Sequence, residues 1–223
     1  MAIPQEDATM IAGQLEEAEQ TKKPIQHISK RYPEMTVNDA YSIQRAWVNL
    51  KLKSGRRRIG WKIGLTSRAM QRSAGISEPD YGQLLDNMLL WSGSRINARD
   101  FIVPRIETEL AFQLKSELKG PNCSLLDVLS ATEWVTPCLE LIDARVEIQD
   151  SESGERRKVL DTISDNAANA AIILGGTPVR PGEVDLTRVA ATLNRNEVIE
   201  DSGVAEAVLT HPGHGVAWLA NKI

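Results

Sequence analysis

A chain of 223 residues, 42% hydrophobic and 25% charged, has the composition of a folded protein with a substantial core, and we expect one functional unit. Its formal net charge of −4 disfavours a duplex nucleic-acid partner, and no apolar run reaches membrane-spanning length. The N-terminus carries acids where a signal peptide carries bases, which predicts a cytoplasmic protein. Cys123 and Cys138 lack the spacing of a zinc or redox pair, so we expect reduced thiols in the core.

Two helices are predicted in the first quarter of the chain. Residues 8–20 repeat apolar side chains at helical spacing. The second helix begins at Thr36, which stands three residues before Asp39 in the manner of a capping box, and it ends at Gly55. Its apolar stripe predicts a face that packs on the core.

The segment GWKIGLT, within residues 59–66, predicts a strand whose second face is nearly bare around Lys62. Glycine weakens a strand and often marks a place where a ligand or another backbone approaches closely. Lys62 therefore either stands on a cleared ligand-binding face or points to solvent from an edge strand. A short helix over residues 67–75 follows, and turn residues then predict that Asp80 lies on a loop.

Two carboxylates share one face of the strand predicted at residues 104–113, because side chains alternate across a strand. Glu107 and Glu109 are two residues apart, so their Cβ atoms lie roughly 6.6 Å apart and both can reach one small ion. A solvated strand face explains the same alternation, and on this stretch alone it is the simpler interpretation.

A third carboxylate lies in an apolar setting. Residues 137–148 predict a strand, preceded by a helix capped at Ser124, and Glu140 stands between Leu139 and Leu141. A buried carboxylate must be protonated, paired or bound to a cation to offset its desolvation. Three carboxylates from two strands, without a matching set of His or Cys, suit Mg²⁺ or Mn²⁺.

The last third of the chain predicts a helix, a hairpin and a closing helix. The first helix runs from about Ser164 to Gly175. Its N-terminal amides either bind an anionic substrate group or are simply capped by Ser164, which is the commoner role of such a serine. The hairpin falls within residues 188–203. His211 and His214 show no metal-ligand spacing, so we interpret them as turn or helix-start residues.

Six motifs occur in one order between about Tyr41 and Asn221: GWKIGLTSRAMQ, ISEPDYGQLLDNM, FIVPRIETELAF, CLELIDAR, DTISDNAANA and HPGHGVAWLANK. Together they closely resemble the hydratase and decarboxylase branch of the fumarylacetoacetate hydrolase superfamily. Several motifs in one order are far more specific than a single pair of glutamates.

The resemblance implies a divalent-cation site, a catalytic pair and a substrate pocket. It implies that Mg²⁺, with Mn²⁺ as an alternative, is held by three carboxylates: Glu107, Glu109 and Glu140. The family's catalytic lysine and aspartate match Lys62 and Asp80. Two positions that line the substrate pocket match Ser164 and Leu65.

The fold implied by the resemblance is α+β, a mixed β-roll or barrel with flanking helices. It divides this chain into an N-terminal helical region, residues 1–58, and a β-roll catalytic domain, residues 59–223. Family members continue past the helix that contains WLANK into glycine-rich strands, which we expect to be missing from this chain. Family members commonly form homo-oligomers, and the resemblance implies the same here.

The reaction implied is a metal-dependent lyase reaction that adds water to a small 2-hydroxydienoate dicarboxylate. Decarboxylation of a substrate of the 4-oxalocrotonate type, through the same enolate chemistry, and hydration of 2-hydroxypenta-2,4-dienoate are open alternatives. Hydrolysis of a carbon–carbon bond usually needs a His–Glu pair, and no histidine stands near the ligand motifs. A scaffold protein without activity is a further alternative, which dispersed carboxylates would support. A diacid substrate also needs a cation for its distal carboxylate, and the candidates are Arg68, Arg72, Arg157 and Lys158.

Overall fold

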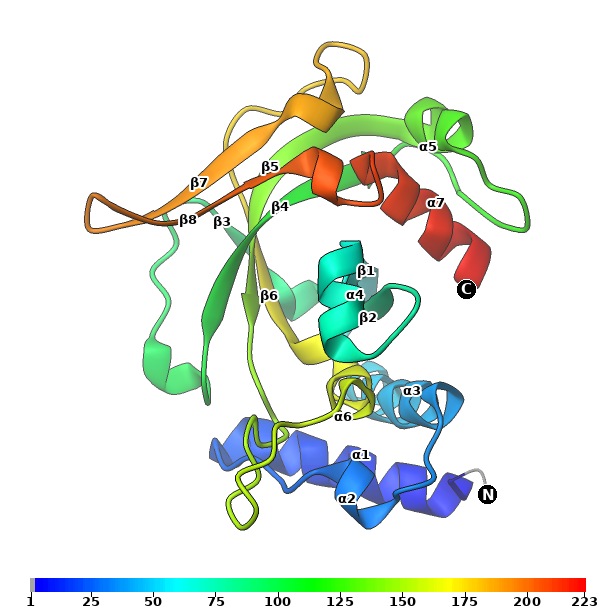
Figure 1. The fold of residues 1–223 in the computed structure, drawn as a ribbon, viewed down its shortest axis with the longest axis vertical. Helices are drawn as coiled ribbons and strands as arrows, with labels where there is room; N and C mark the ends of the chain where they lie inside the picture. Colours follow the sequence, from blue (N-terminus) through cyan, green and yellow to red (C-terminus); the bar gives the residue numbers. More distant parts are fainter. Residues whose placement is uncertain (1–2) are drawn as a thin grey trace.

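The computed structural model describes residues 3–223, and Figure 1 shows helices and sheets in one mixed fold. The helices are α1 (Gln5–Thr21), α2 (Ile28–Arg31), α3 (Val37–Lys53), α4 (Arg68–Ala74), α5 (Leu125–Ala131), α6 (Val159–Ser164) and α7 (Pro212–Lys222). The strands are β1 (Arg58–Gly64), β2 (Asp80–Leu85), β3 (Leu89–Trp91), β4 (Arg105–Leu114), β5 (Thr132–Ile142), β6 (Asn169–Leu174), β7 (Ala190–Arg195) and β8 (Val198–Val204). No helix within these residues has the length and hydropathy needed to cross a membrane.

The strands form three separate sheets. The largest has the order β3-β6-β5-β4, with β3 parallel to β6 and the other pairs antiparallel. The other two are antiparallel pairs, β1 with β2 and β7 with β8. In Figure 1 the largest sheet curves around β1, β2 and α4, while α1, α2, α3 and α6 form a helical layer at one end.

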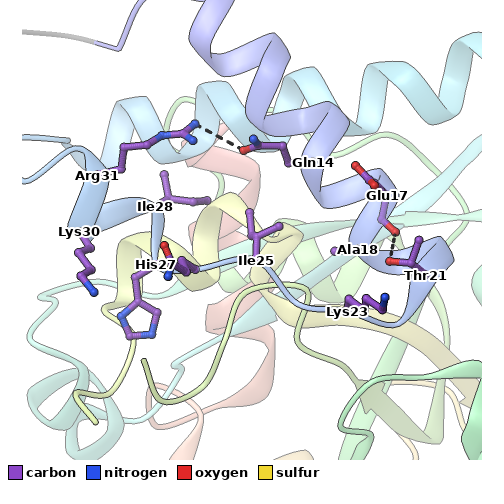
Figure 2. A pocket seen from close by; sticks show the side chains of 11 residues that line it. Gln14, Glu17, Ala18, Thr21, Lys23, Ile25, His27, Ile28, Lys30 and Arg31 are labelled. Carbon is purple, nitrogen blue, oxygen red and sulfur yellow. Dashed lines mark hydrogen bonds between the residues drawn. The ribbon is translucent and has the colours of Figure 1, made fainter. Parts of the chain in front are cut away.

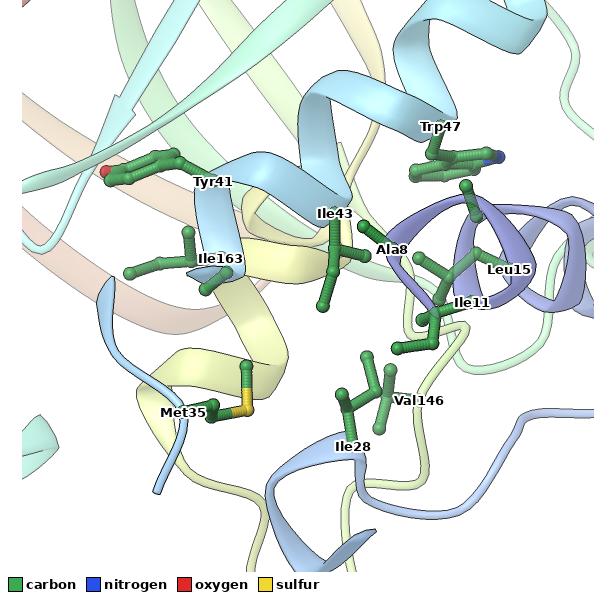
Figure 3. Close-up of a cluster of buried hydrophobic side chains, with 12 residues drawn as sticks. Ala8, Ile11, Leu15, Ile28, Met35, Tyr41, Ile43, Trp47, Val146 and Ile163 are labelled. Carbon is green, nitrogen blue, oxygen red and sulfur yellow. The ribbon is translucent and has the colours of Figure 1, made fainter. Parts of the chain in front are cut away.

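The helical layer has its own hydrophobic core (Figure 3). It is built mainly from α1 and α3, and Val146 and Ile163 join it from later in the chain. The predicted capping box at the start of α3 is confirmed: Asp39 Oδ2 accepts from the Thr36 amide at 2.8 Å, and Thr36 Oγ1 accepts from the Asp39 amide at 3.3 Å. The helix predicted over residues 8–20 is confirmed as α1.

The helix predicted from Ser164 to Gly175 is wrong. Ser164 is the last residue of α6, and β6 begins at Asn169 after a turn in which residues 166–168 have φ between 51° and 61°. The continuous apolar run of a strand buried between two neighbours resembles a helix in sequence, since its side chains are apolar on both faces. The predicted anion site at a helix N-terminus near Ser164 therefore does not exist.

Asp80 does not lie on a loop, because it is the first residue of β2. The turn residues that precede Asp80 end before it, and Gly82, which is unfavourable within a strand, weakens the strand signal of this segment. The predicted hairpin is confirmed as β7 and β8, and the closing helix as α7. His211 is the N-cap of α7 and accepts from the Gly213 amide at 3.0 Å, as its predicted helix-start position requires.

Candidate metal and substrate site

The pairing of β4 with β5 brings the three predicted carboxylates together. Glu107 stands directly opposite Glu140, and Glu109 stands opposite Cys138. One carboxylate oxygen from each of Glu107, Glu109 and Glu140 lies within 4.8 Å of the other two. Like charges directly opposite on a sheet destabilise it, so this register favours a cation between them.

Glu140 is the buried member of this carboxylate cluster, and Glu107 and Glu109 are exposed. Glu140 Oε1 lies 3.3 Å from Lys62 Nζ, but the contact lacks the angles of a hydrogen bond, and this oxygen has no other partner in residues 3–223. Burial raises the pKa of Glu140, and the charge of Lys62 opposes that rise. A buried carboxylate oxygen without a hydrogen bond calls for an explanation, and a cation held between the three carboxylates would supply one.

The charges of the cluster are only partly neutralised. Desolvation by the surrounding protein, together with the negative charges of Glu140 and Glu107, raises the pKa of Glu109 to about 7. The positive charge of Lys62 opposes this rise. Burial lowers the pKa of Lys62, but Glu140, Asp80 and Glu107 outweigh it and raise the pKa overall. One ammonium group thus serves four carboxylates, and a divalent cation would complete the balance of charge.

Lys62 and Asp80 come from the two-stranded sheet. The pairing of β1 with β2 sets Gly64 opposite Asp80, and Asp80 is 2% exposed. A Cβ atom at Gly64 would overlap Asp80 Oδ1 and lie 3.3 Å from Lys62 Nζ. Position 64 therefore needs glycine, which agrees with the predicted bare face around Lys62. The side chain of Lys62 is only 11% exposed, so it does not point to solvent.

The donor set fits a hard divalent cation. All three groups are carboxylates, their oxygens converge, and one of these oxygens is buried without a hydrogen bond. Mg²⁺ and Mn²⁺ prefer such oxygen ligands. Cys138 is a neighbour of the cluster that the sequence motifs do not identify. The register of β4 and β5 places it opposite Glu109. Burial and the charges of Glu109 and Glu140 raise the pKa of its thiol to about 12, so it remains protonated.

The two predicted pocket residues lie in special positions. Ser164 is fully buried, and its hydroxyl donates to the Leu160 carbonyl at 2.8 Å. Leu65 has a left-handed backbone, with φ of 52°, and its carbonyl accepts from Gln71 Nε2 at 2.8 Å. Within residues 3–223 neither forms a hydrogen bond to the carboxylate cluster, and their role in substrate binding stays a prediction.

The predicted cations differ in their surroundings. Arg157 is engaged away from the cluster, because it pairs with Asp165 at 3.7 Å and donates to the Val146 carbonyl at 3.3 Å. Arg68 and Arg72 stand one turn apart on α4 and make no ion pair within residues 3–223. Lys158 is exposed immediately before α6.

A separate cavity of about 670 Å³ lies in the helical layer (Figure 2). It is lined by the second half of α1 and by residues 23–31, including Lys23, His27 and Arg31. None of the predicted site residues lines it. The candidate site is therefore the carboxylate cluster with Lys62 and Asp80, and not this cavity.

The sequence and the fold of this chain match known proteins over almost its whole length. No protein-family model matches the chain. The 2-oxo-hept-4-ene-1,7-dioate hydratase of Escherichia coli is 58% identical over 215 residues, which are 96% of this chain and 80% of the relative. This chain belongs to the hydratase and decarboxylase family of the fumarylacetoacetate hydrolase superfamily.

Other members of this family are more distant. The 4-oxalocrotonate decarboxylase of Pseudomonas putida is 34% identical over 98% of this chain and 80% of its own length. The structure of 4-oxalocrotonate decarboxylase from Pseudomonas putida G7, complexed with magnesium and adipate, superposes with a TM-score of 0.92. It is 33% identical and covers 99% of this chain and 82% of that chain. The mixed fold described above is thus the fold of this family.

Proposed function

We propose that this protein is a Mg²⁺-dependent hydro-lyase that adds water to 2-hydroxyhepta-2,4-diene-1,7-dioate. The observation that carries the proposal is the convergence of Glu107, Glu109 and Glu140 beside Lys62, in a chain that is 58% identical to a hydratase of this diacid. In this proposal the enzyme acts in the homoprotocatechuate branch of aromatic catabolism, and it is located in the cytoplasm.

The three carboxylates hold the cation in this proposal. Solved relatives are complexed with magnesium and adipate or with calcium and acetate, so both a divalent cation and a carboxylate are bound in this family. When bound, Mg²⁺ supplies Lewis-acid stabilisation to the oxygens of a 2-oxo acid. Glu140 is the buried ligand, and a bound cation would give its Oε1 a second charged partner beside Lys62.

In this proposal Lys62 stabilises negative charge on the substrate and Asp80 transfers the proton. Lys62 places positive charge where the substrate's 2-oxygen becomes negative. Asp80 accepts the proton of the 2-hydroxyl group and delivers it to C5, which converts the dienol into an α,β-unsaturated ketone. Water then adds at C4. Burial raises the pKa of Asp80 and the charge of Lys62 opposes it, which suits a carboxyl group that must hold a proton in passing.

The distal carboxylate of the substrate is assigned to α4. Arg68 and Arg72 face the same side of this helix, and neither has an ion-pair partner in the described chain. Arg157 is committed to Asp165. Arg68→Gln and Arg72→Gln are expected to raise the KM for the diacid while leaving turnover of 2-hydroxypenta-2,4-dienoate unchanged. Steady-state kinetics with the two substrates would measure both effects.

The finer architecture also belongs to this proposal. We assign residues 1–58 to an N-terminal helical region and residues 59–223 to a catalytic domain of the β-roll type, in a homo-oligomer. The curvature of the large sheet around β1 and β2 supports a roll (Figure 1). The core of the helical layer also takes in Val146 and Ile163, which ties the two regions together.

The rival function is decarboxylation, because relatives at 33–34% identity are 4-oxalocrotonate decarboxylases. The higher identity to a hydratase favours hydration. An inactive scaffold is disfavoured, because it would leave the carboxylates dispersed and they converge. Mass spectrometry of the product formed from 2-hydroxyhepta-2,4-diene-1,7-dioate tests this choice: gain of one water supports hydration, and loss of CO₂ establishes the rival.

A further inference from the structure

The candidate site is divided between two sheets that share no backbone hydrogen bonds. The carboxylate cluster stands on β4 and β5 of the four-stranded sheet, whereas Lys62 and Asp80 stand on the pair β1 and β2. An isolated two-stranded sheet is marginally stable at best. Other contacts must therefore hold this pair, named here the β1–β2 ribbon, at a fixed distance from the cluster.

One such contact is made by two buried asparagines. Asn166 Nδ2 donates to the Gln83 carbonyl at 2.9 Å, and Asn166 Oδ1 accepts from the Gln83 amide at 2.7 Å. Asn169 Nδ2 donates to the same carbonyl at 3.0 Å. Asn169 is the first residue of β6, so it joins the ribbon directly to the four-stranded sheet.

A second contact repeats this pattern two residues earlier on β2. Gln44 Nε2, from α3, donates to the Tyr81 carbonyl at 2.9 Å, and Tyr41 Oη accepts from the Tyr81 amide at 3.3 Å. Side chains thus bind both backbone groups of residues 81 and 83 along the edge of β2 that β1 does not cover. The residue between them, Gly82, pairs with Lys62 of β1.

The backbone around Asn166 is shaped for this contact. Residues 166–168 are three successive residues other than glycine with positive φ, between 51° and 61°. Such conformations persist only where the surroundings hold them. A Cβ atom at Gly82 would overlap the Asn166 carbonyl oxygen, so the backbones of the turn and the ribbon are in direct contact and leave no room for a side chain at position 82.

We infer that Asn166 and Asn169 are positioning residues, which act through Gln83 to hold Lys62 and Asp80 against the carboxylate cluster. The inference rests on the proposed function for the reaction that this alignment serves. It assigns a role in alignment to two side-chain amides that make no hydrogen bond to the three carboxylates within the described residues. A misplacement of about 1 Å between catalytic groups costs on the order of 100-fold in rate.

The test compares Asn166→Asp and Asn166→Gly with a matched control. Aspartate keeps the shape and the acceptor but loses the donor, and both replacements tolerate a left-handed backbone. The control is Asn221→Asp, because Asn221 binds both backbone groups of Cys123 in the same way, at 2.8 Å and 2.9 Å, far along the chain from the ribbon. The measurements are kcat, KM and the Mg²⁺ dissociation constant by calorimetry.

The expected result is a loss of kcat of about 10-fold to 100-fold in both Asn166 variants, with the Mg²⁺ dissociation constant and KM within about twofold of the unsubstituted protein. The Asn221 variant should keep its kcat within about twofold. An unchanged kcat in folded Asn166 variants overturns the inference. So does a loss of Mg²⁺ affinity in proportion to the loss of kcat, because that marks general loosening of the fold.

Failure of the proposed function has a different signature. If the unsubstituted protein does not hydrate the dienoate, amide hydrogen exchange at Gly82 and Gln83 decides the positioning role. Faster exchange in Asn166→Gly, with unchanged Mg²⁺ affinity, supports a ribbon held by the asparagines. Unchanged exchange at both amides overturns the inference.

Discussion

Single residues decide whether this site can work, and Gly64 shows why. The sequence predicts close approach at the glycines of this strand, and at position 64 a side chain would enter the space shared by Asp80 and Lys62. The same strand offers a comparison at Gly60, where a Cβ atom would lie 3.6 Å from Leu84 Cδ1, an ordinary contact. The glycines of β1 therefore differ in purpose although they look alike in sequence.

Gly64→Ala should lower kcat by about 10-fold to 100-fold, because Asp80 must move away from its position beside Lys62. Gly60→Ala should leave kcat within about twofold, and steady-state kinetics with the diacid would compare the two. Equal kcat values for the two variants would contradict the assigned arrangement of Asp80 and Lys62.

Removal of either catalytic group gives a second prediction at this scale. Lys62→Ala or Asp80→Asn should lower kcat by about 100-fold to 10,000-fold, which is the usual contribution of general acid–base catalysis. Circular dichroism would establish that each variant keeps its fold. Normal turnover by either folded variant would refute its catalytic assignment.

At the scale of elements, local signals predicted those parts of the fold that local physics determines. The capping boxes at Thr36 and Ser124 marked the starts of α3 and α5. Alternation marked β1 and β4. The two carboxylates on β4 were placed on one face by period alone, and the structure agrees.

Elements held by distant partners could not be predicted in this way. The sequence of β6 predicts a helix because it is apolar on both faces, and only its neighbours β3 and β5 explain that composition. The strand β2 has turn residues before it and a glycine within it, and side chains of Asn166, Gln44 and Tyr41, distant in sequence, bond its free edge. The contact of Lys62 with Glu140 likewise depends on the approach of two sheets, which no spacing in the sequence reveals.

Thr36→Ala tests the capping box as a local device. It should lower the free energy of unfolding by about 1 kcal/mol. For a chain of this size that corresponds to a fall in Tm of roughly 2–4 °C. Thr9→Ala, at an exposed position inside α1, is the control and should leave Tm nearly unchanged. A capping box without energetic value would give both variants the same Tm.

At the scale of the whole molecule, the cation is expected to stabilise the fold as well as the reaction. In the proposed site Mg²⁺ is held by carboxylates of both β4 and β5, which only the native strand pairing brings together, so its binding would favour the folded state. At 100 times the dissociation constant it should add about 2.7 kcal/mol, or roughly 5–10 °C in Tm. Thermal unfolding with Mg²⁺ and with EDTA would measure this difference, and identical Tm values would contradict a cation bound by the native sheet.

Glu109→Gln tests the central claim most directly, namely that one carboxylate cluster binds the cation on which hydration depends. The variant keeps the size of the side chain and removes its charge, and Glu117→Gln, on the exposed loop after β4, is the control. Calorimetry should show that Glu109→Gln weakens Mg²⁺ affinity by at least about 100-fold, more than the roughly 10-fold to 100-fold effect of changing a residue that only contacts a ligand. Product analysis on the same samples should show loss of water addition. The control should retain both. Tight Mg²⁺ binding or undiminished hydration in Glu109→Gln would contradict the account.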